Sequence, residues 1–115
     1  MTFDVEIVLR EHTEAVIERI EHPQEPAGWT DADVEAVLKQ ILLAIDRVKN
    51  PGATDRYVAL RGFSWIVEPS EGGVVIAIEI PMGAAVAGPF AIPQRDLDAM
   101  ITRVLAGTRP RQTVH

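Results

Sequence analysis

The sequence predicts one α+β domain of two layers, in which helices cover a small antiparallel sheet. Apolar residues recur at helical spacing near the start, in the middle and near the end of the chain, whereas residues 56–80 are rich in β-branched and aromatic side chains. A chain of 115 residues suits one compact core. The predicted order is helix, helix, strand, strand, an optional third strand and helix. Residues 1–107 would form the domain, and residues 108–115 would fray.

The first element fits two periodicities. Every second residue from Phe3 to Leu9 is apolar, as in a half-buried strand. As a helix, the same stretch and the residues after it show one apolar and one acidic face, and Pro23 ends the pattern. Because the helical pattern covers the longer window, we favour a helix over Thr2–Glu21. A short strand followed by a helix from Thr13 is the alternative.

The second helix is marked at both ends. Thr30 is placed to cap it, and acidic residues in its first turn interact favourably with the helix dipole. An apolar stripe repeats at spacings of three and four along its length, and the sequence NPG at residues 50–52 stops it. A similar stripe from Leu97 to Leu105 predicts the last helix.

The long apolar stretch at residues 72–92 is expected to belong to the sheet. It carries one charge, Glu79, and it is interrupted by glycine and proline, which leave pieces of strand length and argue against a membrane span. The turn SEGG joins two strands as a hairpin, and GAAVAGPFAI supplies the optional third strand. Gly83 and Gly88 have the spacing of a phosphate-binding loop, but the lysine and hydroxyl residue that such a loop needs do not follow Gly88.

Charge and cysteine content narrow the classes of function. The chain has no cysteine, which excludes disulfides and thiolate chemistry and favours the cytoplasm. Residues 1–35 hold ten acidic and two basic residues, a formal charge of −8, and the remainder carries +2. This distribution opposes binding to nucleic acid or to an anionic membrane, and it suits docking to a basic protein. A solvated acidic surface without a partner is the ordinary alternative.

Few side chains offer chemistry. His12 could act as a general base and Ser64 as a nucleophile, but a lone histidine usually packs, and Ser64 lacks the pattern of a nucleophile elbow. Glu14, Glu18 and His22 would share one ridge of the first helix, at a spacing that a divalent cation could use. Without a facing pair of ligands, we expect an exposed acidic ridge, no metal and no cofactor.

Two further groups are candidates for binding. Arg61 and the small-residue loop with Met82, Gly83 and Gly88 could line a ligand pocket, since small side chains allow a close approach. Trp65 is a candidate for the core or for a partner interface.

We expect a small cytoplasmic protein-binding domain, adaptor- or immunity-like and not an enzyme. Its acidic first helix, with Glu11, Glu14 and Glu18, would face a basic partner together with Trp65. A homodimer is expected because so small a sheet, covered by helices on one side, leaves its other face to cover. The alternative is a small-molecule binding module or enzyme with a pocket between the sheet and the helices.

Overall fold

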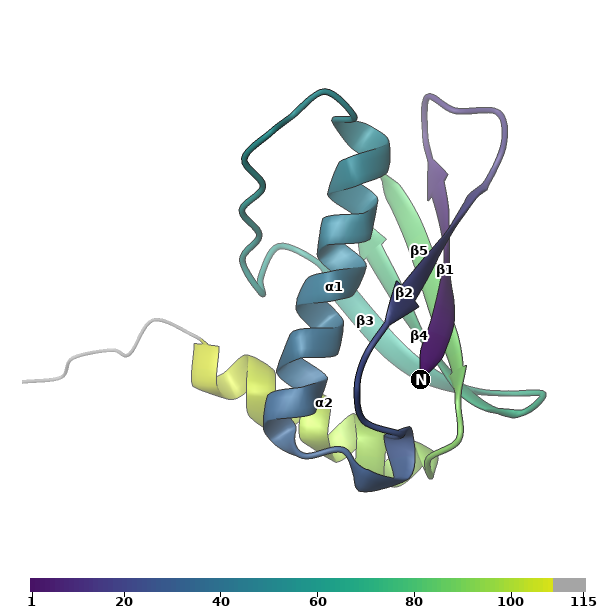
Figure 1. Ribbon diagram of the computed structural model, residues 1–115, viewed down its shortest axis with the longest axis vertical. Coiled ribbons are helices and arrows are strands. Elements are labelled where there is room, and N and C mark those ends of the chain that lie inside the picture. The colour runs from purple at the N-terminus through teal and green to yellow at the C-terminus, as the bar shows by residue number, and fades with distance from the viewer. Residues whose placement is uncertain (109–115) are drawn as a thin grey trace, which may run out of the picture.

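Residues 1–108 are described by a computed structural model, in which two α-helices pack on a five-stranded antiparallel sheet (Figure 1). The strand order is β2-β1-β5-β4-β3. The predicted α+β class with a small antiparallel sheet is therefore confirmed. The elements are β1 (Thr2–Leu9), β2 (Val16–Glu21), a short 3₁₀ helix (Pro26–Gly28), α1 (Asp31–Lys49), β3 (Ser64–Ser70), β4 (Gly73–Ile80), β5 (Gly83–Phe90) and α2 (Gln94–Thr108).

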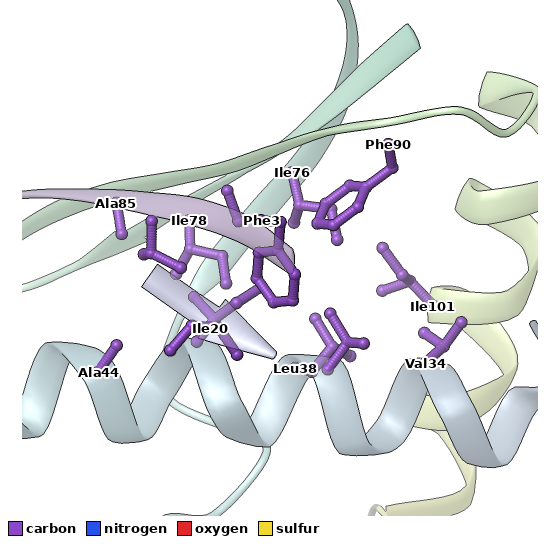
Figure 2. Close-up of a cluster of buried hydrophobic side chains, with 14 of the residues drawn as sticks. Phe3, Ile20, Val34, Leu38, Ala44, Ile76, Ile78, Ala85, Phe90 and Ile101 are labelled. Carbon is purple, nitrogen blue, oxygen red and sulfur yellow. The ribbon is translucent and has the colours of Figure 1, made fainter. Parts of the chain in front are cut away.

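Both helices lie on the same side of the sheet (Figure 1). The hydrophobic core fills the layer between the sheet and the two helices. Along β1, every second side chain from Phe3 to Leu9 is buried, while the side chains between them are exposed or half-buried. This alternation sends one set of strand side chains toward the helices. Figure 2 shows that layer, with Phe3 and Ile78 on the sheet side, Leu38 on α1 and Ile101 on α2.

The helix predicted after Thr30 is confirmed as α1. Thr30 is its N-cap: the Asp33 N–H donates to Thr30 Oγ1 at 3.4 Å, and the Thr30 N–H donates to Asp33 Oδ2 at 2.9 Å. The helix ends at Lys49, directly before the predicted stop at Asn50. The predicted hairpin β3–β4 and the last helix, α2, are also present.

The predicted first helix is wrong, and residues 2–21 form the hairpin β1–β2 instead. Thr2 pairs with Glu21 across this hairpin. The burial of β1 follows the alternation in its sequence, and only a strand can bury every second residue against a helix layer. The alternative helix from Thr13 is also absent, because that segment continues into β2. The connecting residues 10–15 contain no glycine, proline or asparagine, so the sequence does not mark the turn.

The optional third strand is present, and it lies in the centre of the sheet. β5 pairs with β1 on one side and with β4 on the other. At Gly83, an added Cβ would lie 2.2 Å from the Val8 carbonyl oxygen, so only glycine fits where β1 and β5 approach. Gly88 has a φ of +133° and precedes a cis peptide bond to Pro89, beside an irregularity in the β4–β5 register.

The C-terminal helix α2 reaches Thr108, one residue beyond the predicted domain end at Gly107. The rest of the predicted tail lies outside the described residues. Among residues 1–108, no helix combines the length and the apolar character needed to cross a bilayer.

Candidate functional site

The face of the sheet that points away from α1 and α2 is the open face, and a row of side chains crosses its five strands, apolar at every strand except β1. The pairing register places one residue of each strand in line, in the order Ile17, Glu6, Val86, Ala77 and Ile66. The exposed fractions of Ile17, Val86 and Ile66 are 64%, 40% and 51%. Four interstrand steps of ~4.8 Å make the row about 19 Å long. Clustered exposed apolar side chains with a polar rim are typical of interaction surfaces.

Carboxylates lie around this row and, at Glu6, within it. Five acidic strand residues point to the open face, and Arg19 is the one basic strand residue that does so, which leaves a formal charge of −4. The Arg19 Nε donates to Asp4 Oδ1 at 3.2 Å, so these two charges offset each other. No ion pair within residues 1–108 engages the other four carboxylates, which are Glu6, Glu21, Glu68 and Glu79.

The acidic residues that were expected to share a helical face are separated. Glu18 lies on the helix side of β2, where its Oε1 accepts a hydrogen bond from Arg47 Nε of α1 at 2.9 Å. Glu11 and Glu14 are exposed in the β1–β2 loop. Without a first helix, Glu14, Glu18 and His22 form no common ridge. Residues 1–108 contain no group of three side chains placed to hold a metal ion.

The structure does not bring the candidate base and nucleophile together. His12 is exposed in the β1–β2 loop, where its backbone N–H donates to the Leu9 carbonyl at 3.0 Å. Ser64 is exposed on the open face, opposite Glu79 of β4. In the described part of the chain, no hydrogen bond joins His12 to Ser64. Trp65, the next residue of β3, points to the helix side and packs half-buried against the core.

The candidate pocket residues lie at three different places. Met82 and Gly83 are at the β4–β5 turn, Gly88 is near the far end of β5, and Arg61 is in the connection between α1 and β3. Along an extended strand, the two glycines are about 17 Å apart. The layer between sheet and helices, where the alternative function would place its pocket, is filled by the buried side chains of Figure 2. These residues therefore do not define one ligand site.

A buried histidine was not anticipated from the sequence. His22 is 7% exposed, its Nε2 donates to Asp33 Oδ1 at 3.0 Å, and its ring packs edge-on against Trp29. The bond from the Thr30 N–H, followed by the bond from His22, lowers the pKa of the Asp33 carboxyl. The spacing of Thr30 and Asp33 is a recognisable capping signal, but no local pattern links it to His22. Because Asp33 is the N3 residue of the capping box of α1, this pair anchors the helix to the end of β2.

No known protein family, curated protein or solved structure matches this chain. Within residues 1–108, the open face combines exposed apolar side chains with carboxylates that have no ion partner.

Proposed function

We propose that this protein is a small protein-binding domain that docks a basic partner on its open face. The observation that carries the proposal is the row of exposed apolar side chains, Ile17, Val86 and Ile66, on a face with four carboxylates that have no ion partner in residues 1–108. Protein interfaces commonly combine an apolar centre, which is desolvated on binding, with a polar rim. Charged rim residues increase the association rate and select the partner by its charge.

The charge of the open face defines the chemistry of the partner. Four unpaired carboxylates would repel the phosphates of nucleic acid or of an anionic lipid surface. A protein surface with lysine or arginine around an apolar centre is complementary to it. Together with the absence of cysteine, this supports an adaptor- or immunity-like role in the cytoplasm.

The test compares the open face with the β1–β2 loop. Glu6→Gln, Glu68→Gln and Glu79→Gln are combined in one variant, and Glu11→Gln and Glu14→Gln in a matched control. Immobilised wild-type protein captures partners from an extract of its host, and the captured protein is identified and purified. Calorimetry at low and high salt then measures its affinity for wild type and for both variants.

We expect the captured protein to be basic and to bind the open-face variant on the order of tenfold more weakly at low salt. The control should bind like the wild type, and the difference should shrink at high salt. Equal affinity of the open-face variant and wild type would contradict the proposal. Loss of binding in the control alone would assign the interface to Glu11 and Glu14 instead.

A further inference from the structure

The two edges of the sheet differ in their capacity to accept another strand. The β3 edge is closed, because the Gln94 side chain donates from Nε2 to the Val67 carbonyl at 2.8 Å. That carbonyl therefore points away from β4, and so does the backbone of Pro69, two residues further along β3. Proline has no N–H to donate. The outer side of β3 thus offers few free groups to an added strand.

The β2 edge is open. The His22 N–H donates to the Met1 carbonyl at 2.9 Å, so the even-numbered residues of this strand direct their backbone groups toward β1. The odd-numbered residues Ile17, Arg19 and Glu21 direct theirs outward. In the described part of the chain, no further hydrogen bond reaches the outward groups of these three residues. This row of free donors and acceptors is a template for strand pairing.

We propose that the β2 edge is a homodimer interface, in which a second copy of the chain adds its β2 antiparallel to the first. With a two-fold axis, the two residue numbers of every opposite pair add up to the same sum. Opposite residues also lie on the same face of the sheet. The axis must therefore pass through one residue of β2. The choice of that residue decides which side chains meet.

Side-chain charge selects the register. An axis through Glu18, Arg19 or Glu21 sets that residue against its own copy, and like charges directly opposite each other are destabilising. An axis through Val16 or Ile17 would pair β2 with residues that precede Val16 and therefore lie outside the strand. An axis through Ile20 sets Arg19 of each copy against Glu21 of the other, which gives two pairs of opposite charge. This register alone places opposite charges across the interface.

The interface about Ile20 also satisfies the backbone. Arg19 and Glu21 are outward-facing residues, so each of the two symmetric pairs exchanges both main-chain hydrogen bonds. The Arg47 bond to Glu18 shows that α1 borders this edge on the helix side. Leu43 lies one turn before Arg47 on the same flank and is half-buried, so the second copy would cover it further. The two sheets would join into one sheet of ten strands.

This dimer is independent of the proposed docking on the open face. Glu6, Glu68 and Glu79 lie on β1, β3 and β4, whereas the dimer contact involves β2 and the neighbouring flank of α1. A two-fold dimer would present two acidic open faces on the same side of the joined sheet. Loss of dimerisation would leave the charge of each open face unchanged.

The test is a charge exchange measured by sedimentation velocity over a wide concentration range. Arg19→Glu opposes Glu21 of the second copy with another acid, and Glu21→Arg opposes Arg19 with another base. Each single variant should raise the dimer dissociation constant on the order of tenfold or more, because two attractive pairs become repulsive. The double variant R19E/E21R exchanges the charges and should restore the dimer.

A second measurement controls for folding and reports the backbone pairing. Circular dichroism should show all variants folded, because the exposed Arg19–Asp4 ion pair contributes little stability. Hydrogen exchange of the Arg19 and Glu21 amides should slow as the wild-type concentration rises. A wild type that stays monomeric, single variants that dimerise normally, or a double variant that stays monomeric would each overturn the proposal.

Discussion

Among single residues, Gly83 has no room for a side chain. A Cβ at this position would lie 2.2 Å from the Val8 carbonyl oxygen and 2.9 Å from the Leu9 Cα. Because these are backbone atoms of the paired strand β1, they cannot move aside without disturbing the ladder. We expect Gly83→Ala to lower the free energy of unfolding by about 2 kcal/mol, as overpacking usually does. Titration with urea measures this loss.

Gly107 supplies the matched control in the helix α2. A Cβ there meets no atom within 4 Å, and alanine is the better helix former. Gly107→Ala should therefore leave the free energy of unfolding unchanged or raise it slightly. If Gly83→Ala proves as stable as the control, the close approach of β1 and β5 does not constrain this position.

The same glycine shows why a pocket was expected where two strands meet. A small side chain has the same appearance in a sequence whether a ligand or another strand approaches it. Gly83 pairs with Leu9 and lies against the Val8 carbonyl, both far away along the chain, and no local pattern contains that pairing. The small residues therefore predicted a close approach correctly, but they did not show that a neighbouring strand, and not a ligand, approaches.

At the scale of elements, the N-terminus of α1 depends on one carboxylate. Asp33 accepts bonds from the Thr30 N–H and from His22, and these bonds lower its pKa below the ordinary value of 3.8. A carboxyl whose pKa falls on folding stabilises the fold above its unfolded pKa, and this contribution is lost as the pH falls through the folded value. We expect Asp33→Asn to lower the melting temperature at pH 7, and the gap to wild type to narrow in acid, below about pH 4.

Asp55→Asn provides the control for this change, because Asp55 is an exposed residue of the connection between α1 and β3. Thermal melts of wild type and both variants, taken from neutral to acidic pH, should show a gap for Asp33→Asn only. A gap for Asp33→Asn that stays constant into strong acid would mean that the ionised carboxylate does not stabilise α1.

Elements with local signals were predicted, and the element without them was not. α1 has a capping box and a stop sequence, and β3 and β4 are joined by a glycine turn that the sequence displays. The β1–β2 hairpin has neither, since its loop at residues 10–15 is composed of residues that also suit a helix. Its acidic residues extend the helical pattern through the turn. The alternation from Phe3 to Leu9 was the correct signal, but it covered the shorter window.

At the scale of the whole molecule, the sequence predicted an acidic protein but not where the acidic surface lies. Glu6 and Glu79 reach the open face on strands separated by β5, so their placement depends on pairings between distant segments. The expected homodimer stays a prediction, but the proposed contact is now the β2 edge and no longer the uncovered face of the sheet. A five-stranded sheet with an acidic open face would repel its own copy face to face, whereas the β2 edge is complementary to itself.

The open-face carboxylates also make a prediction about stability. Glu6, Glu68 and Glu79 have no ion partner in residues 1–108, and they share a face with a formal charge of −4. Mutual repulsion should therefore weaken the fold, so the variant E6Q/E68Q/E79Q should unfold at an equal or higher urea concentration than wild type in low salt. Added salt should remove the difference, because it screens exposed charges. Asp4→Asn, which removes the partner of Arg19, should give no such gain.

If the triple variant is less stable than wild type, the three wild-type carboxylates support the fold, and their presence no longer argues for a basic partner. If it is equally or more stable, the chain keeps these charges at no structural benefit, as surfaces that serve binding commonly do.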